Sequence, residues 1–357
     1  MSQNELRWGI LSTGNIARAF ADDLPKSHTG RLVAVASRTR ESADKFVASR
    51  DGAKAYGEYE ALLADPDVDA VYLATPHPQH AEWAVRAARA GKHVLCEKPL
   101  AVHAGDAEAM QAAASEAGVT LREAFMYRAH PQTQRLVELL REGTIGSVQL
   151  MDLRFSFRAG DDPAGRLLSN EAAGGGILDV GCYTVNLANL LAGREPAEVR
   201  GAAHLGATGV DEWATAALTY EGGLIAQLLC GVRLKVPGPQ ATVYGTGGRI
   251  EVDQAFIPGR HGGEVALRVI RGEEVEVVTT RDERPLYAVE ADSFASAVAG
   301  ETYDPLPSPA ETLANMRTLD RWRRREEPRG PDVVVFALVG EWLPGPQPRE
   351  HLQPLIE

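Results

Sequence analysis

Cysteine is scarce in this chain. The three cysteines among 357 residues, Cys96, Cys182 and Cys230, lack the spacing of a metal site or of a disulfide framework. Reduced thiols fit this usage, so we expect a cytoplasmic protein without a bound metal. Hydrophobic runs that could span a bilayer are also missing, and the N-terminus lacks the basic and apolar regions of a secretory signal. The sequence therefore predicts neither a secreted disulfide scaffold nor a membrane protein.

Positive charge is in deficit as well. Lys and Arg number 37 against 49 Asp and Glu, and the net charge of −12 argues against a nucleic-acid partner. The basic run at 321–325 does not reverse this, because it ends a predicted helix, where cations offset the helix dipole. An apolar fraction of 44% and a charged fraction of 24% are those of a globular protein, and the length allows two domains. We expect a small-molecule ligand.

The N-terminal third alternates apolar strands with amphipathic helices. This alternation is typical of a parallel sheet with helices on both faces. We expect strands at 7–12, 31–37, 70–74, 93–97 and 120–124, and helices at 15–24, 40–49, 58–63, 79–90 and 105–118.

The rest of the chain follows a different pattern. After a predicted helix at 133–142, segments alternate polar with apolar residues, which predicts an antiparallel sheet with one solvated or partner-covered face. These strands are expected at 147–158, 198–205, 213–220, 224–232, 241–244, 249–252 and 264–269. A last helix is expected at 309–326, and a strand at 333–338 within a proline-rich end.

A glycine-containing turn follows the first predicted strand, reading Ser12-Thr13-Gly14-Asn15-Ile16-Ala17. Glycine at such a turn lets the backbone approach a pyrophosphate, and the next helix N-terminus favours the anion. Serine replaces the first glycine of the usual pattern and alanine the last, so a glycine kept only for steric reasons is the alternative. Placement on the first strand of an alternating series favours a dinucleotide site.

We therefore predict an α/β fold with an N-terminal Rossmann doubly wound parallel sheet and a C-terminal α+β domain with a largely antiparallel open sheet. Residues 1–124 form the dinucleotide-binding domain and residues 125–308 the substrate and oligomerisation domain. The helix at 309–327 packs back on the N-terminal domain, and residues 328–357 form a tail without an assigned role.

The turn after the second strand indicates the cofactor. It reads Ser37-Arg38-Thr39-Arg40 and has no carboxylate for the ribose hydroxyls of NAD. Its hydroxyl and guanidinium groups suit a 2′-phosphate, so we expect NADP, with NAD as the alternative. The alternative is that this is an exposed basic turn that binds no ligand.

Two further segments carry candidate chemistry. Lys98 follows a predicted parallel strand in Glu97-Lys98-Pro99, at the sheet edge where doubly wound folds bind ligands. Asp179 and Tyr183 are four residues apart in a predicted helix and are expected on one face with Asn186. A free tyrosine has a pKa of about 10, which a neighbouring ammonium group such as Lys98 would lower. The alternative is a structural role for both residues, with Asp179 near the helix start for its dipole and Tyr183 half-buried in a domain interface.

Together these residues resemble the Gfo/Idh/MocA family of NAD(P)-dependent oxidoreductases over roughly residues 6–326. The motifs that carry the resemblance are the turn at 12–17, Ala74-Thr75-Pro76-His77-Pro78-Gln79-His80, Glu97-Lys98-Pro99 and Asp179-Val180-Gly181-Cys182-Tyr183. Within the family, Tyr183 resembles the branch with glucose–fructose oxidoreductase, dimeric dihydrodiol dehydrogenase and NADP-dependent xylose dehydrogenase. That branch has tyrosine at the position where inositol dehydrogenases have histidine.

The resemblance implies specific roles. Tyr183 would be the proton donor or acceptor, Lys98 would orient the substrate, and Asp179 would bind substrate hydroxyls. The implied cofactor-binding residues are Ser12, Thr13, Gly14, Asn15, Ile16, Ser37, Arg38, Arg40, Thr75, Pro76, His77, His80, Glu97, Lys98 and Arg128. Tyr127 and Phe157 would shape the substrate pocket, the peptide before Pro99 would be cis, and the open sheet would form a homodimer or homotetramer.

The resulting hypothesis is an NADP-dependent oxidoreductase that acts on a secondary alcohol or ketone of a sugar, polyol or related cyclic compound. Two alternatives share the fold: a glycosidase that uses tightly held NAD, and a non-catalytic sensor of sugars or nucleotides. Retention of both Lys98 and Tyr183 argues against the sensor.

Overall fold

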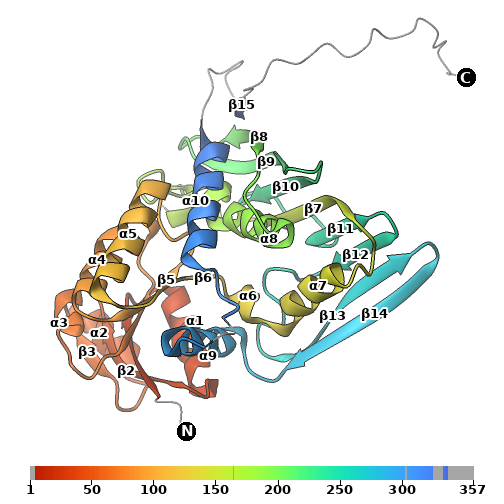
Figure 1. Ribbon diagram of the computed structural model, residues 1–357. Coiled ribbons are helices and arrows are strands. Elements are labelled where there is room, and N and C mark those ends of the chain that lie inside the picture. The colour runs from red at the N-terminus through yellow and green to blue at the C-terminus, as the bar shows by residue number, and fades with distance from the viewer. Residues whose placement is uncertain (1–4, 164, 302–303, 325–332, 337–357) are drawn as a thin grey trace, which may run out of the picture.

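The computed structural model describes residues 5–163, 165–301, 304–324 and 333–336. Its N-terminal part is a six-stranded parallel sheet in the order β3-β2-β1-β4-β5-β6 (Figure 1), which confirms the doubly wound prediction. The strands are β1 (Leu6–Leu11), β2 (Gly30–Ala36), β3 (Lys54–Tyr56), β4 (Ala70–Leu73), β5 (His93–Glu97) and β6 (Leu121–Ala124). The chain reverses direction across the sheet between β1 and β4, so the loops after these strands meet at one crevice.

Helices cover the parallel sheet. They are α1 (Asn15–Asp23), α2 (Arg40–Val47), α3 (Tyr59–Leu63), α4 (His80–Arg89) and α5 (Ala104–Ala117), with short 3₁₀ turns η1 (Leu24–Lys26) and η2 (His77–Gln79). Each lies within a few residues of its prediction where one was made. The missed element is β3, a three-residue edge strand whose Lys54 is exposed, so that no apolar run marks it.

The second sheet has nine strands in the order β14-β13-β12-β11-β7-β10-β9-β8-β15. They are β7 (Val148–Ser156), β8 (Glu198–Leu205), β9 (Asp211–Thr219), β10 (Ile225–Gly231), β11 (Ala241–Gly245), β12 (Gly248–Val252), β13 (Gly263–Arg271), β14 (Glu274–Asp282) and β15 (Val333–Phe336). Only β7 and β10 pair in parallel among these neighbours. The prediction of a largely antiparallel sheet is confirmed.

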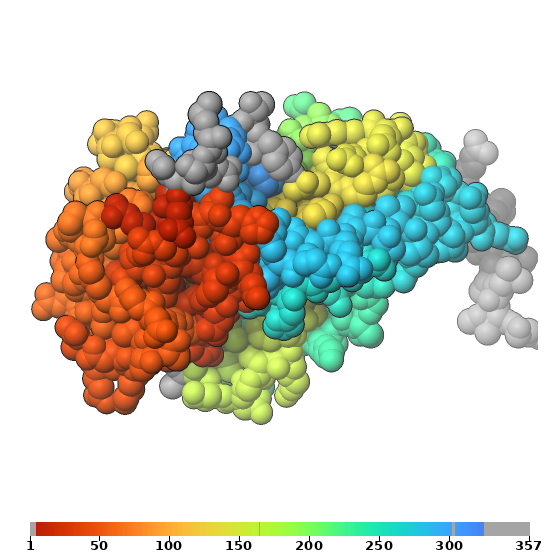
Figure 2. All heavy atoms as spheres, turned by 90° about the horizontal axis from the view of Figure 1, so that it is seen from below, coloured from red at the N-terminus to blue at the C-terminus, as the bar shows by residue number. Residues whose placement is uncertain are grey.

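The second part of the chain also contains helices, some of which cover one face of this sheet. They are α6 (Met126–Ala129), α7 (Pro131–Arg141), α8 (Cys182–Ala192), α9 (Leu286–Ala299) and α10 (Pro309–Arg323), with η3 (Arg166–Leu168) and a π-helical turn, η4 (Ile177–Gly181). α7 packs on β13 and β14, and α8 packs on β7 and β10. Figure 2 shows the N-terminal domain and the end of the sheet around β14 as neighbouring lobes. Among the described residues, no helix covers the opposite sheet face, which exposes Trp213, Ile225 and Tyr244.

Two C-terminal helices fasten the domains together. α10 packs on both α5 and α8, while α9 packs on α1 and α6. On α9, the Asp292 carboxylate accepts hydrogen bonds from the backbone N–H groups of His28 and Thr29 at 2.9 and 3.1 Å. The sequence did not predict α9, because its first six residues are all buried and a one-sided apolar pattern is therefore missing.

No helix within the described ranges is long and apolar enough to cross a membrane. The same residues contain no group of three His, Cys, Asp or Glu side chains that could hold a metal ion.

A buried carboxyl group holds the loop that presents Lys98. Glu123 on β6 is fully buried, and its Oε1 accepts the backbone N–H of Leu100 at 2.8 Å. Burial raises the pKa of this carboxyl to about 7, even though the Leu100 hydrogen bond favours the ionised form. The native state therefore keeps a proton that the unfolded chain has released once the pH exceeds the usual value of 4.5.

In the parent protein, the free energy of unfolding should fall as the pH rises from about 4.5 to about 7, because the native state binds more protons than the unfolded chain in that range. We expect the Glu123→Gln variant to lack this fall. The free energy of unfolding of the variant should exceed that of the parent above pH 7, by on the order of 1–3 kcal/mol. Urea titrations at several pH values measure this, with the exposed Glu116→Gln as control. Parallel pH dependences for the parent and E123Q would refute it.

Candidate active site

The candidate site lies where the crevice of the parallel sheet meets a segment of the C-terminal domain. The loops after β1, β2, β4 and β5 form one wall, and the chain from η3 to the start of α8 forms the other. Two contacts join the walls. Lys98 Nζ donates to the backbone oxygen of Asp179 at 2.8 Å, and His77 Nδ1 lies 3.4 Å from the backbone oxygen of Ala173.

The glycine-containing turn has the geometry of a dinucleotide site. Ser12 has a φ of 107°, a conformation that glycine adopts readily, and so takes the place of the missing first glycine. Its hydroxyl accepts the N–H of Gly14 at 3.2 Å. A Cβ at Gly14 would meet only Ser12 Oγ, at an ordinary 3.5 Å, so packing within the described chain does not require this glycine. That finding disfavours the steric alternative and leaves room for a ligand, next to Asn15 and Ile16 at the start of α1.

The turn after β2 lies beside the glycine turn. Ser37 Oγ is 3.3 Å from Thr13 Oγ1, and Arg38 is exposed at the same place. Arg40 is exposed too, but its Nε donates to Asp44 at 2.9 Å on the same helix. Of the two predicted arginines, Arg38 is therefore the better placed for a phosphate group, because it has no such ion pair among the described residues.

The loop after β4 is fixed by a histidine. His80 is fully buried, with Nδ1 3.0 Å from the oxygen of Pro99 and Nε2 2.8 Å from the oxygen of Thr75. Burial outweighs these carbonyl contacts and lowers the pKa of His80. The ring connects the loops after β4 and β5, and so positions Thr75 and Pro76 instead of facing an open site. The Lys98–Pro99 peptide is cis, as the resemblance implied.

Lys98 lies among acidic and aromatic partners. Its Nζ is 3.9 Å from Asp179 Oδ1 and 5.0 Å from the centre of the Tyr183 ring. Burial acts to lower the pKa of Lys98, but acidic neighbours, Asp179 foremost, outweigh it and the net shift is upward. Lys98 is therefore a cation with donors available for an oxygen atom in the crevice.

Asp179 is held by two cations. Arg166 Nη2 donates to its Oδ1 at 2.8 Å, and Lys98 approaches from the other wall. Burial acts to raise the pKa of this carboxyl, yet Lys98 and Arg166 outweigh it and the pKa is lowered. His77, nearby, is kept neutral because burial lowers the pKa of its ring well below the usual value. The carboxylate can thus accept hydrogen bonds from substrate hydroxyls.

Tyr183 projects into an aromatic cluster. Its ring lies 5.1 Å from that of Phe125, 5.2 Å from that of Phe155 and 5.8 Å from that of Phe256, and its hydroxyl donates to Met126 Sδ at 3.3 Å. The structure thus brings Lys98 and Tyr183 together. The expected lowering of the phenol pKa is wrong for this state, because burial raises the pKa of Tyr183 well above its usual value.

The predicted geometry of the Asp179–Tyr183 helix needs a correction. A π-helical turn at Ile177–Gly181 precedes α8, so the two residues do not follow regular α-helical spacing. Asp179 faces Arg166, while Tyr183 faces the aromatic cluster. Asn186 is not on the substrate side, since its Oδ1 accepts the hydroxyl of Tyr127 at 2.6 Å.

Three other predicted residues lie behind the site. Tyr127 is fully buried against Asn186, and Arg128 Nη2 is 2.8 Å from Glu311 Oε1 on α10. Phe157 is partly buried and packs on both hydrophobic clusters, the main core and the small group around Leu168. These side chains are occupied by protein contacts, so in this structure they support the site instead of facing the crevice.

Sequence reasoning missed two residues here. Arg166 has no motif around it, and only the fold places it on Asp179. Glu290 of α9 is fully buried near Glu97, which accepts the hydroxyl of Tyr72 and the N–H of Lys98. Burial raises the pKa of both carboxyls, and for Glu290 the charge of Glu97 adds to the effect.

Comparisons with known proteins agree with this geometry. The chain is 37% identical to trans-1,2-dihydrobenzene-1,2-diol dehydrogenase of Mus musculus over 257 residues, which are 71% of this chain and 76% of that protein. It is 36% identical to D-xylose 1-dehydrogenase (NADP(+)) 2 of Haloferax volcanii over 320 residues, which are 88% and 95% of the two chains.

Solved structures are similar over nearly the same length. A 3-ketoreductase of Actinomadura kijaniata in complex with NADP and TDP-benzene has a TM-score of 0.79 and 30% identity, covering 90% of this chain and 97% of that one. The aldose-aldose oxidoreductase of Caulobacter crescentus, complexed with glycerol, has a TM-score of 0.80 and 27% identity, covering 89% and 96%.

Two family models match consecutive parts of the chain. Residues 6–125 match an oxidoreductase family with an NAD-binding Rossmann fold, and residues 133–251 match the GFO/IDH/MocA C-terminal domain. The first match contains all six strands of the parallel sheet, and the second contains the part of the mixed sheet from β7 into β12. The chain therefore belongs to the Gfo/Idh/MocA family of oxidoreductases.

Proposed function

We propose that this protein is an NADP-dependent oxidoreductase that acts on a secondary alcohol or ketone of a sugar, polyol or related cyclic compound. The observation that carries the proposal is the meeting of Lys98, Asp179 and Tyr183 at the carboxyl end of the dinucleotide-binding sheet. Names of similar proteins support the substrate class, since they include a dihydrodiol dehydrogenase, a xylose dehydrogenase and an aldose oxidoreductase.

The chemistry needs a hydride and a proton at one carbon–oxygen bond. A bound nicotinamide supplies the hydride acceptor or donor. Lys98 binds and orients the substrate oxygen through its ammonium N–H groups, and Asp179 binds neighbouring hydroxyls. Tyr183 exchanges the proton with that oxygen. Burial raises the pKa of Tyr183 and so favours its protonated phenol, which supports the role of proton donor to a ketone in this proposal.

The residues that would hold the cofactor fit the group. The N-terminus of α1 and Gly14 offer backbone N–H groups for the pyrophosphate, and Thr13, Ser37 and Arg38 offer donors for a ribose 2′-phosphate. The walls near His77 and Lys98 would hold the nicotinamide end. Two similar proteins support this choice over NAD, since one is named as an NADP(+) dehydrogenase and the other was solved in complex with NADP.

We expect Tyr183→Phe and Lys98→Met to lower kcat by about 10²- to 10⁴-fold while the cofactor still binds, because each removes a group that acts on the substrate oxygen. NADPH absorbance, with a panel of aldoses, inositols and diketones, measures turnover, and fluorescence titration measures cofactor binding. Tyr220→Phe is the matched control, since this buried tyrosine donates to Asn189 of α8 at 2.9 Å and makes no described contact with Lys98 or Asp179. Wild-type turnover in both variants would refute the mechanism.

A second prediction concerns the cofactor. Arg38→Ala should raise the KM for NADPH by about tenfold or more and leave the KM for NADH nearly unchanged, because only NADPH carries the 2′-phosphate. Arg40→Ala should have a smaller effect, since Arg40 is already paired with Asp44. Equal changes for both cofactors would contradict the assignment of Arg38.

We also propose that the uncovered face of the mixed sheet pairs with a second copy of the chain. Tyr244, Leu150 and Ile225 stand opposite one another on β11, β7 and β10, which places them on one face in a row without charge. Tyr244 and Ile225 are 38% and 42% exposed, and Trp213, at 37%, lies on the same face near the other end of β9. Apolar side chains gathered on a flat sheet face are typical of a subunit interface.

Ile225→Arg is expected to convert the oligomer to a monomer, because it places a desolvated charge within the apolar row. Sedimentation velocity measures the change, and Glu116→Arg on α5 serves as a control for added charge. If I225R and the parent sediment alike, this face is not the interface.

A further inference from the structure

A second cavity lies behind the wall that carries Asp179. It has a volume of about 550 Å³, within the size range of small-molecule sites. Its walls come from the loop before α5, the loop before η4, the turn between β8 and β9, and the end of α10. The lining residues are Val102, His103, Asn170, Ala173, Gly174, Ile177, Leu178, Leu205, Gly209, Val210, Asp211, Asp320, Arg323 and Arg324. Lys98, Asp179 and Tyr183 are not among them, so this cavity differs from the candidate active site.

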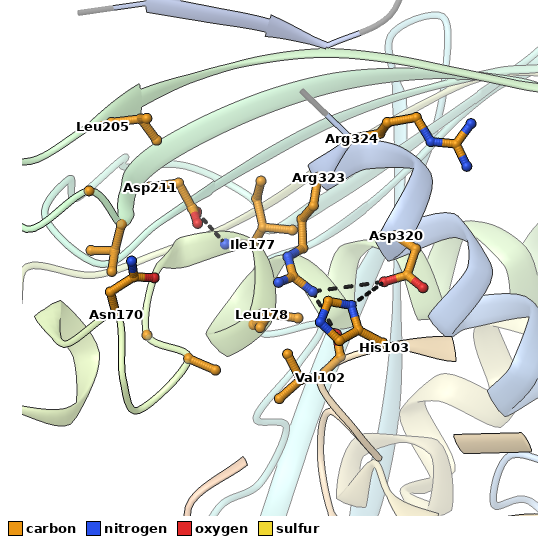
Figure 3. A pocket seen from close by; sticks show the side chains of 14 residues that line it. Val102, His103, Asn170, Ile177, Leu178, Leu205, Asp211, Asp320, Arg323 and Arg324 are labelled. Atoms are coloured by element: carbon orange, nitrogen blue, oxygen red, sulfur yellow. Dashed lines mark hydrogen bonds and ion pairs between the residues drawn. The ribbon is translucent and has the colours of Figure 1, made fainter. Parts of the chain in front are cut away.

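A partly buried arginine points into this cavity. Figure 3 shows the guanidinium group of Arg323 reaching from α10 toward the centre, whereas Arg324 points away. One N–H of Arg323 donates to the oxygen of Val102 at 2.6 Å. Among the described residues, Asp320 Oδ1 lies 3.8 Å from Arg323 Nη1, and Asp320 Oδ2 accepts the N–H of Ala104 at 2.8 Å. A guanidinium group has five N–H donors, so several remain for a ligand.

The opposite side of the cavity offers groups for hydroxyls. Asp211 extends from the start of β9, and its Oδ2 accepts the N–H of Ile177 at 2.6 Å (Figure 3). The second oxygen of this carboxyl and the amide of Asn170 provide further polar atoms. Leu178, Leu205 and Val210 form apolar surface between the polar groups.

We propose that this cavity is a second ligand site, for a small hydroxylated carboxylate or phosphate. Arg323 binds the anionic group, because a planar guanidinium matches the two oxygens of a carboxylate or phosphate. Asp211 and Asn170 bind the hydroxyls. The volume and the mixture of polar and apolar walls fit a compact metabolite instead of a polymer.

The cavity shares its wall with the candidate active site. Ala173 lines the cavity, and its backbone oxygen lies 3.4 Å from His77 Nδ1. Ile177, whose N–H Asp211 holds, begins the π-helical turn that carries Asp179 two residues later. A ligand in the cavity would therefore contact the segment that carries Asp179. Binding to the cavity can be measured without turnover, so this proposal does not depend on the proposed function.

Isothermal titration of the full-length protein with D-gluconate and with inorganic phosphate tests the proposal. We expect saturable binding of at least one probe, and binding at least about tenfold weaker in Arg323→Gln, because charge-assisted hydrogen bonds are lost. D-Gluconamide, the uncharged analogue of gluconate, should bind weakly or not at all. Arg321→Gln is the matched control, since Arg321 on the same helix donates to the backbone oxygens of Pro196 and Ala197 outside the cavity.

Two further variants keep the test decisive. Asn170→Trp, at an exposed loop position, should block the cavity and abolish binding even if R323Q folds poorly. Lys98→Met should retain binding, because Lys98 lies in the other site. Absence of saturable binding of both probes up to about 10 mM would overturn the proposal. Binding that K98M loses while R323Q keeps it would also overturn it, since the probe would then occupy the active site.

Discussion

The contact between Lys98 and Asp179 is the constraint around which the site is arranged. The two residues are 81 positions apart and belong to different domains, yet Lys98 Nζ donates to the backbone oxygen of Asp179 at 2.8 Å. A partly buried ammonium group needs polar partners, because an unpaired buried charge costs several kcal/mol or more. Asp179 supplies both a carbonyl and a carboxylate, and Arg166 completes the cluster. The charges that serve the proposed chemistry therefore also fix how the two lobes meet.

The prediction of the fold was accurate where local pattern and tertiary environment agree. Parallel strands buried on both faces, such as β4 and β5, stand out as short apolar runs, and the amphipathic helices between them show their periodicity. It was incomplete where burial is unusual. α9 was missed because it is buried almost all round at its start and so lacks a one-sided apolar pattern. β14 was also missed, although Glu274-Val275-Glu276-Val277 alternates polar with apolar residues.

The candidate site was predictable to the extent that motifs describe it. Lys98, Asp179 and Tyr183 were named from the sequence, and the structure brings them together. Arg166 was not, because an arginine in a loop has no local signal and only the fold places it on Asp179. The sign of the Tyr183 pKa shift was also out of reach, since it depends on how completely Phe125, Phe155 and Phe256 enclose the phenol.

The ring of His80 has a mechanical consequence. It spans the loops after β4 and β5, with one nitrogen near Thr75 and the other near Pro99, so that neither loop shifts without the other. His80 thus joins the two loops of the N-terminal wall into one unit. Separating this wall from the C-terminal one would break the contacts of Lys98 with the backbone oxygen of Asp179 and of His77 with the backbone oxygen of Ala173.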